Sequence, residues 1–459
     1  MVNTAKAALV IKNYLDCKED NQMNFPTEVK KKLFDLIDEM DTFHWLFTKN
    51  PEKDFSREKK WSFGSVLKFM ITMEGKSLKD ELLEYFNFDK ATPSNSSFNQ
   101  RRAQILPEAF EFLFHEFTNS FPNKEALYKG LRLIACDGSS LCISHNPKDE
   151  TTYFHSNPNI KGFNQLHLNA LYDLCRRTYV EAEIQPGRQE NESRAMCHMI
   201  DRYDGEKAIF IADRNYENYN IFAHVEQKGM YYLIRVKDIH SSGILRSLVL
   251  PDTDSFDVNK TLILTKKQTN AIKADKQKYR FIPSTSTFDY LDLHKNKFYE
   301  MSMRIVRFPI SENSYECIIT NLPQEEFSSD ELKMLYQKRW GIETSFRELK
   351  YAVSLTRFHS KKVEYIEQEI WARMLLYNFC EIITANVVVN QKEHRKHTYQ
   401  INYTRAIKIC CHFLTLKEEN APPDVEYLIG HELLPVRPGR SDPRKVRPTS
   451  HISFLYRAA

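Results

Sequence analysis

The 459-residue sequence lacks the cysteine patterns that build zinc sites or redox motifs. Its nine cysteines include no CxxC pair, and no cysteine–histidine array has zinc-finger spacing. An odd number of scattered thiols is typical of a reducing cytosol, where most cysteines are small buried residues. We therefore expect a cytoplasmic protein.

Long apolar runs are missing as well. No stretch approaches the roughly 18 consecutive apolar residues that a membrane-spanning helix needs. The first residues, MVNTAKAALVIKNYLDCKED, lack the apolar core and the small-residue cleavage site of a signal peptide. These absences lead us to expect a soluble protein with no membrane partner.

Neither sign of charge dominates. Lys and Arg total 65 against 61 Asp and Glu, a net charge of +4, which is too small to indicate a nucleic-acid partner by itself. The histidines show neither HExxH nor HxH spacing, so a zinc hydrolase has little support. Local clusters of charged residues, rather than the net charge, must therefore indicate the function.

What is present is a globular composition, with 42% hydrophobic and 12% aromatic residues and a length that allows two to four domains. Residues 1–125 have apolar side chains at helical spacing, for example Val66, Leu67 and Met70, and predict a helical domain. The C-terminal region, residues 396–459, is predicted to be helical and basic.

Between these regions the pattern changes to strands. LRLIACDG, QLHLNALYDL and TYVEAEIQPG predict successive strands, and alternating helices and strands follow, so residues 126–239 should form an α/β domain. In residues 240–317 the helical signal vanishes, and TLILTKKQ, KYRFIPS and FYEMSMRIVRFPI predict an inserted subdomain of antiparallel strands. Residues 318–395 return to the α/β pattern, with helices at about 328–352 and 363–390.

Two acids follow apolar runs directly. Asp137 follows LRLIAC and Asp213 follows AIFIA, so each is predicted to project from the end of a buried strand. If those strands are neighbours, the two carboxylates can converge on one metal ion. The alternative is that each Asp simply begins a turn.

A third acid lies on a patterned helix. Tyr336, Arg339, Glu343 and Lys350 fall within an arc of about 60° on a regular helix. One face would then carry a phenol, a guanidinium, a carboxylate and an ammonium in a row. The alternative is an exposed helix laced with ordinary ion pairs.

Tyr-x2-Arg-x3-Glu-x6-Lys resembles the signature of the insertion-sequence-four family of bacterial DDE transposases. ACDGSS around Asp137 and IADRNY around Asp213 resemble that family's first and second catalytic motifs, and Glu343 matches its third acid. The sequence departs from the family at Asn215, where glycine is common. Asparagine tolerates left-handed backbone angles, so we expect the turn to survive.

The resemblance implies an RNase H-like core interrupted by a β-rich insertion and preceded by an α-helical DNA-binding domain. It also implies that Asp137, Asp213 and Glu343 hold two Mg²⁺ ions, which Mn²⁺ can replace, with Asp137 bridging both. The expected reaction is cut-and-paste transposition: cleavage at terminal inverted repeats and strand transfer into target double-stranded DNA. A homodimer is expected on DNA, with the protein nucleoid-associated. A metal-dependent nuclease without joining activity and a domesticated DNA-binding element remain as alternatives.

DNA contacts are predicted at two places. Tyr336, Arg339 and Lys350 should contact phosphates beside the acids. A helix at residues 94–105, with SLKDELLEYF before it, resembles a helix-turn-helix, and its Asn99, Arg101 and Arg102 are side-chain types that read bases. An ordinary polar surface helix is the alternative. The Arg-rich tail at residues 437–447 is predicted to contact phosphates, or else to be solvated.

Overall fold

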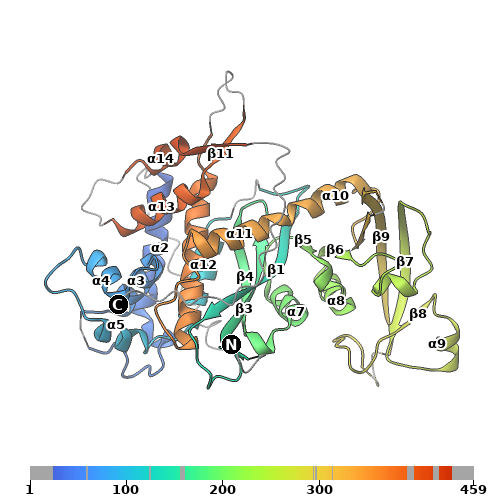
Figure 1. Cartoon of the computed structure of the whole chain (residues 1–459), viewed down its shortest axis with the longest axis horizontal. Coiled ribbons are helices and arrows are strands. Elements are labelled where there is room, and N and C mark those ends of the chain that lie inside the picture. The colour runs from blue at the N-terminus through green and yellow to red at the C-terminus, as the bar shows by residue number, and fades with distance from the viewer. Residues whose placement is uncertain are drawn as a thin grey trace. The chain divides into compact units, whose positions relative to one another are not determined.

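The computed structural model describes residues 24–57, 60–122, 126–155, 161–292, 294, 297–312, 314–389, 397–416 and 423–436. The chain divides into two compact units (Figure 1). The helical unit comprises Met1–Asn123, Leu141–Leu166 and Phe346–Ala459, and the sheet unit comprises Lys124–Ser140 and His167–Ser345.

The first part of the helical unit confirms the predicted helices. They are α2 (Phe25–Thr42), α3 (Phe63–Thr72), α4 (Leu78–Tyr85), α5 (Asn95–Arg102) and α6 (Glu108–Asn119). Helices α2 to α5 each begin after an Asn or Ser whose side-chain oxygen accepts a backbone N–H of the first turn. Such caps satisfy N–H groups that have no partner within the helix, and they fix where each helix starts.

Helix α12 (Val363–Ala385) is the centre of this unit and is buried along nearly its whole length. It packs against α2, α3, α6 and α13 (Tyr403–Thr415), and it also contacts α14 (Val425–His431). A short hairpin of β11 (Tyr399–Ile401) and β12 (Leu433–Pro435) completes the C-terminal part. The N-terminal helices therefore share one core with C-terminal helices. No helix in the described ranges has both the length and the apolarity needed to cross a membrane.

The sheet unit contains the predicted α/β strands. They are β1 (Arg132–Ile143), β3 (Phe163–Asp173), β4 (Thr178–Pro186), β5 (Ala208–Ala212) and β6 (Tyr231–Val236). Strand β1 pairs in parallel with β5, and β5 with β6. On the other side, β3 borders β1 and β4 pairs with β3, while the two-residue β2 (Tyr153–Phe154) pairs with the start of β3. Helices α7 (Glu192–Arg202) and α8 (Tyr219–Gln227) lie where the sequence predicts them.

The insertion is β-rich, as predicted, but it extends the same sheet. Strand β10 (Ser314–Thr320) pairs with β6, β9 (Tyr299–Ser311) with β10, and β7 (Phe256–Thr265) with β9, all antiparallel. Strand β8 (Tyr279–Phe281) runs parallel to β7, so the prediction of a purely antiparallel insertion without helix is wrong there. Helix α9 (Asn270–Ala274) explains the difference, because parallel neighbours need a connection that crosses back.

Side chains alternate between two apolar layers on the faces of this sheet. On one face Ile134, Phe210 and Tyr232 pack with residues of α7 and α8. On the other face Leu133 and Ile211 pack with α10 (Ser329–Lys338). Helices on both faces bury the central strands, so residues at the strand ends have fixed positions.

Candidate active site

Asp137 and Asp213 occupy matching places on two neighbouring segments of chain. The parallel register of β1 and β5 pairs Ala135 with Ile211, and each Asp comes two residues after its member of that pair. Asp213 follows the last residue of β5, as predicted. Asp137, in contrast, lies inside β1, because β1 keeps its neighbour β3 beyond the end of the shorter β5. The prediction that Asp137 ends its strand is therefore wrong.

Asp213 is fixed by its own turn. Its carboxylate accepts the backbone N–H of Asn215 at 2.8 Å and caps a 3-10 turn, Arg214–Tyr216. Asn215 lies within this turn and does not have a positive φ. Glycine is therefore not needed at residue 215, and asparagine forms the turn without strain.

The helix predicted over residues 328–352 consists of two segments in line. Helix α10 ends at Lys338, and α11 runs over Trp340–Tyr351, with Arg339 between them in a helical conformation. Arg339 donates its N–H to the Tyr336 carbonyl and accepts the N–H of Ile342, and both are tight i,i+3 bonds. Because the helix tightens at Arg339, Tyr336 does not keep the position relative to Glu343 and Lys350 that a regular helix would give it.

Arg339 links two of the three acids. Its Nη2 donates to Glu343 Oε1 at 2.8 Å, and its Nη1 lies 4.0 Å from Asp137 Oδ2. The side chain is 6% exposed, and its Nε has no hydrogen-bond partner among the described residues. The guanidinium carbon also lies 5.7 Å from the centre of the Tyr336 ring and 5.2 Å from that of Trp340. Glu343 is thereby held beside Asp137.

The electrostatics of Asp137 indicate that negative charge converges here. Burial raises the pKa of Asp137 to about 6. The Gly138 N–H and Arg339 oppose this rise in pKa, whereas the charges of Asp213 and Glu343 add to it. Carboxylates that destabilise each other's ionised form are stabilised by a cation.

The donor set fits a divalent metal. Three carboxylates offer the oxygen ligands that Mg²⁺ and Mn²⁺ prefer. Within the described ranges, no group of three or more Asp, Glu, His or Cys side chains lies close enough together to hold a metal ion. Here Arg339 supplies the positive charge next to Glu343. A metal ion bound by Glu343 would have to replace that partner.

Tyr336 and Lys350 lie in different surroundings. Tyr336 is 4% exposed and packs with Leu332 and Leu335, and burial raises the pKa of its phenol, an effect that Arg339 opposes. Lys350 lies two turns beyond Glu343 in α11, in the part of that helix that belongs to the helical unit. Burial lowers the pKa of its ammonium group.

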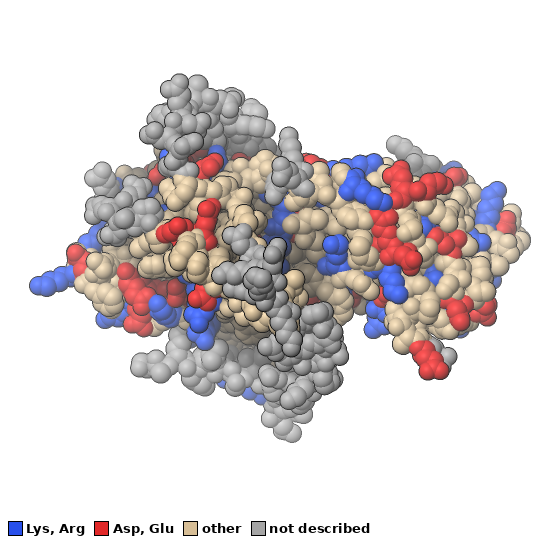
Figure 2. All heavy atoms as spheres, turned by 90° about the horizontal axis from the view of Figure 1, so that it is seen from above, with Lys and Arg blue, Asp and Glu red and all other residues tan. Residues whose placement is uncertain are grey.

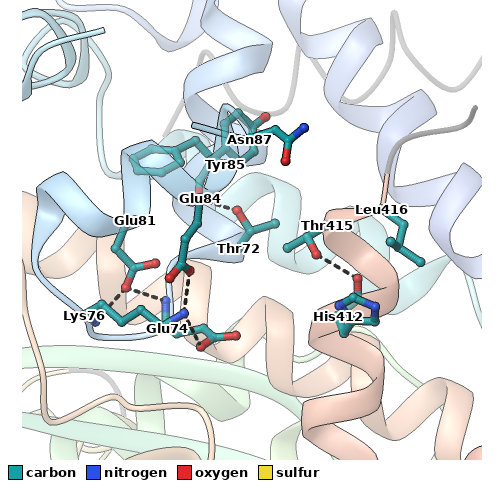
Figure 3. Close-up of a pocket in the computed structure, with 11 residues that line it drawn as sticks. Thr72, Glu74, Lys76, Glu81, Glu84, Tyr85, Asn87, His412, Thr415 and Leu416 are labelled. Atoms are coloured by element: carbon teal, nitrogen blue, oxygen red, sulfur yellow. Dashed lines mark hydrogen bonds and ion pairs between the residues drawn. The ribbon is translucent and has the colours of Figure 1, made fainter. Parts of the chain in front are cut away.

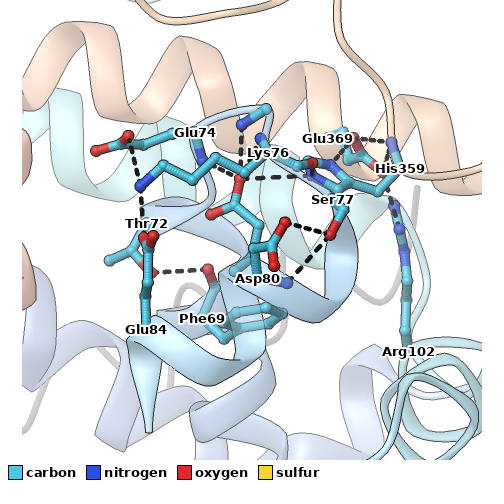
Figure 4. Close-up of polar contacts among 12 residues, drawn as sticks. Phe69, Thr72, Glu74, Lys76, Ser77, Asp80, Glu84, Arg102, His359 and Glu369 are labelled. Atoms are coloured by element: carbon cyan, nitrogen blue, oxygen red, sulfur yellow. Dashed lines mark hydrogen bonds and ion pairs between the residues drawn. The ribbon is translucent and has the colours of Figure 1, made fainter. Parts of the chain in front are cut away.

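The N-terminal DNA-contact candidates differ in exposure. Asn99 is exposed on α5. The Arg101 guanidinium lies 5.0 Å from the centre of the Phe55 ring and donates to Gln104 at 3.0 Å. Arg102 is completely buried and donates to Glu369 at 2.9 Å (Figure 4). The prediction that Arg102 contacts DNA is therefore wrong for this conformation, and the tail at residues 437–447 lies outside the described residues.

On the face that Figure 2 shows, Lys and Arg are interspersed with Asp and Glu, in agreement with the small net charge of +4. A pocket of about 370 Å³ in the helical unit contains the Lys76–Glu84 ion pair and includes none of the three acids (Figure 3). Neither feature competes with the carboxylates as the candidate site.

Sequence reasoning missed three residues next to Asp137. Gly138, His167 and Glu192 lie together, because an added Cβ at Gly138 would meet both of the other side chains. His167 and Glu192 come from β3 and α7. Their spacing along the chain carries no recognisable motif, so only the fold brings them together.

Residues 128–379, more than half of the chain, match the family described as Transposase DDE domain. One similar protein is the transposase InsG for insertion sequence element IS4 of Escherichia coli (strain K12), 29% identical over 132 residues, which are 26% of this chain and 29% of that protein. Another is the transposase for insertion sequence element IS231F of Bacillus thuringiensis subsp. israelensis, 19% identical over 313 residues, 62% of this chain and 64% of that protein. The matched part is thus less than two thirds of each relative.

Among solved structures, a cryo-EM structure of the piggyBac transposase synaptic complex with hairpin DNA has a TM-score of 0.44 and 13% identity. The alignment covers 92% of this chain and 88% of that one. The region that matches the family contains Asp137, Asp213 and Glu343. The chain belongs to the DDE transposases of insertion sequences.

Proposed function

We propose that this protein is a DNA transposase that cleaves at the ends of its element and joins them to target DNA by a cut-and-paste route. One observation carries the proposal. Asp137, within β1, and Asp213, directly after the adjacent parallel strand β5, each come two residues after the Ala135–Ile211 pair, and Arg339 joins Glu343 to Asp137. The strand order β4-β3-β1-β5-β6, with acids on β1 and directly after β5, supports the RNase H-like core that the sequence resemblance implies.

In this proposal the carboxylates of Asp137, Asp213 and Glu343 would hold the metal, two Mg²⁺ or Mn²⁺ ions. Such ions lower the pKa of bound water and stabilise charge on the attacking and leaving oxygens of a phosphodiester. The residues themselves have separate tasks. The sheet holds Asp137 and Asp213 in place, while the helix carries Glu343 within reach of Arg339.

Arg339 has a second task once Glu343 is engaged elsewhere. A guanidinium binds phosphate through paired N–H groups, so Arg339 released from Glu343 would be positioned for DNA. Lys350 and Tyr336 are proposed to assist there, and Asn99 and Arg101 are proposed to contact DNA from the N-terminal helices. The substrate in this proposal is double-stranded DNA with terminal inverted repeats, bound by a homodimer.

The first experiment compares Asp137→Asn, Asp213→Asn and Glu343→Gln with the unchanged protein. The assay uses DNA that carries the ends of the element, in Mg²⁺. We expect each variant to bind this DNA but to lose cleavage by at least about a hundredfold, because the acids hold metal rather than DNA. Asp204→Asn, at an exposed acid of the same unit, is the matched control and should cleave normally.

A joining assay on the unchanged protein distinguishes a transposase from a nuclease. Integration of a pre-cut end with a free 3′-hydroxyl into plasmid DNA supports a transposase. Cleavage without integration would indicate a nuclease, and DNA binding without either reaction would indicate a binding protein. Full cleavage by Asp137→Asn would overturn the assignment of the metal site.

A further inference from the structure

Gly138 follows Asp137 in β1, and its N–H donates to Asp137 Oδ1 at 2.9 Å. An added Cβ at Gly138 would lie 2.3 Å from His167 Nε2 and 2.6 Å from Glu192 Oε1. Both distances are far below van der Waals contact. Gly138 has no positive φ, so glycine is needed here for close approach rather than for backbone freedom.

His167 lies between two glutamates. Its Nε2 is 3.1 Å from Glu192 Oε1, and its Nδ1 is 3.2 Å from Glu190 Oε2. The imidazole is 7% exposed, and neither ring nitrogen completes a well-aligned hydrogen bond within the described part of the chain. A buried polar ring that is incompletely satisfied is rare in folded proteins and indicates a task beyond packing.

Glu192 is anchored at the start of α7. The preceding residue, Asn191, caps the helix by accepting the Arg194 N–H at 2.9 Å, and it donates its own N–H to Gln185 at 2.8 Å. A carboxylate in the first turn is also favoured by the helix dipole. The backbone of Glu192, whose side chain lies next to Gly138, is therefore held in place.

The charges of Glu192 and Asp137 both affect the buried phenol of Tyr216. Burial first, and then the charges of Cys136, Glu192 and Asp137, raise the pKa of the Tyr216 phenol. Tyr216 is 1% exposed and belongs to the same core as Cys136 and Ala212, the residues that precede Asp137 and Asp213. The His167–Glu192 pair is thus close to Asp137 without being one of the three acids.

We propose that His167 and Glu192 form a positioning pair that holds the backbone at Gly138 and, through the Gly138 N–H, the orientation of the Asp137 carboxylate. This inference rests on the proposed function, because it assumes that Asp137 binds metal. Residues that orient a metal ligand from behind typically change metal affinity about 10- to 100-fold when they are removed. Gly138 is the contact point through which the pair acts.

The test measures binding of Mn²⁺ to the full-length protein by electron paramagnetic resonance of the free ion. We expect His167→Ala and Glu192→Gln to weaken Mn²⁺ binding about tenfold, with folding checked by circular dichroism. His167→Gln keeps a donor toward Glu192 and should recover most of the affinity. His198→Ala, at an exposed histidine of α7 that pairs with Glu183, is the matched control.

A double-mutant cycle tests the contact at Gly138. Gly138→Ala forces a methyl group against the His167 ring and should also weaken Mn²⁺ binding. Gly138→Ala/His167→Ala removes the collision with the ring but keeps the one with Glu192 Oε1, so the double variant should lose less affinity than the sum of the two single losses. Additive losses would overturn the contact. Should His167→Ala not fold, Glu192→Gln, which keeps its shape, decides the question.

Asp137→Asn separates this inference from the proposed function. If Asp137→Asn leaves Mn²⁺ binding intact, the proposed metal site itself is wrong. If Asp137→Asn abolishes binding while His167→Ala and Glu192→Gln bind like the unchanged protein, only the positioning pair is wrong. Loss in all three, with recovery in His167→Gln, supports both.

Discussion

At the scale of single residues, Arg339 has surroundings that differ from those its sequence pattern predicts. The sequence pattern assigns it to DNA phosphates, and the structure shows its guanidinium buried against Glu343 and facing Asp137. A metal ion and the Arg339 guanidinium would compete for the Glu343 carboxylate. The two assignments agree if Arg339 pairs with Glu343 before metal and DNA are bound and with phosphate afterwards.

Arg339→Gln tests this exchange. It removes a positive charge that competes for Glu343 and Asp137, so we expect Mn²⁺ to bind about tenfold more tightly, corresponding to about 1.4 kcal/mol. DNA cleavage should fall, because the phosphate contact is lost. Lys338→Gln, at an exposed cation one residue earlier, should change neither quantity. Weaker Mn²⁺ binding in Arg339→Gln would mean that the guanidinium supports the site rather than competing for it.

At the scale of elements, α5 shows why composition alone misassigns side chains. The helix has no acid of its own, so its arginines seem free in the sequence. Arg102 instead pairs with Glu369 of α12, which is 267 residues away in the chain. Only the packing of α5 and α12 into one unit reveals that partner.

Paired substitutions on α5 separate stability from DNA contact. Arg102→Ala leaves Glu369 buried with one partner fewer, and we expect it to destabilise the protein by about 3–5 kcal/mol. Asn99→Ala removes an exposed side chain, so it should leave the thermal midpoint unchanged and weaken DNA binding. Thermal unfolding and a DNA filter-binding assay measure the two effects. Weaker DNA binding by Arg102→Ala at unchanged stability would contradict the buried assignment.

A network of titratable side chains joins α4, α12 and His359, which precedes α12 (Figure 4). His359 Nδ1 lies 3.1 Å from Glu369, its Nε2 lies 3.6 Å from Glu81, and Glu81 accepts the N–H groups of Glu74, Gly75 and Lys76. Despite burial, His359 and the three N–H groups lower the pKa of Glu81 from 4.5 to about 2, and Arg102 and then His359 lower that of Glu369 to the same value. Against burial, the hydrogen bonds with Glu369 and Glu81 raise the pKa of His359 above 6.5.

These shifts predict a stability maximum between about pH 4.5 and 6.5 for the helical unit. The contribution of the two glutamates is complete above pH 4.5 and is lost as pH falls toward 2, because the unfolded chain binds more protons. The contribution of His359 is complete below pH 6.5 and is lost as pH rises through its raised pKa.

Urea unfolding across this pH range measures the effect. Replacing Trp340 with Phe leaves tryptophans only in the helical unit, so fluorescence reports on that unit alone. His359→Gln should remove the decline on the alkaline side, and His412→Gln, at an exposed histidine, should keep it. An unchanged alkaline decline in His359→Gln would rule out this network as its source.

At the scale of the whole molecule, local patterns predicted elements and long-range pairing decided the rest. The apolar run before Asp137 and the AIFIA strand were visible in the sequence, because a buried parallel strand is continuously apolar. The parallel β8 and the position of Asp137 inside β1 depend on which strands become neighbours. The shared core around α12 and the His167–Glu192 pair depend on contacts between distant segments.

The local sequence pattern alone does not identify the three acids as catalytic, and the family resemblance is needed as well. Asp137 and Asp213 alone are ordinary acids next to strands. The structure adds that β1 and β5 are parallel neighbours, with each acid two residues after the Ala135–Ile211 pair, and that Arg339 joins Glu343 to Asp137. The match to the transposase DDE domain covers all three positions.

The most direct test of the central claim is anomalous diffraction from crystals of the protein bound to the DNA ends of its element in Mn²⁺. We expect two manganese peaks about 3.5–4 Å apart, with Asp137 touching both and Asp213 and Glu343 each touching one. In the same crystals, Arg339 should have left Glu343 for a DNA phosphate. Manganese bound elsewhere, or Glu343 still paired with Arg339 beside a bound DNA end, would contradict the claim.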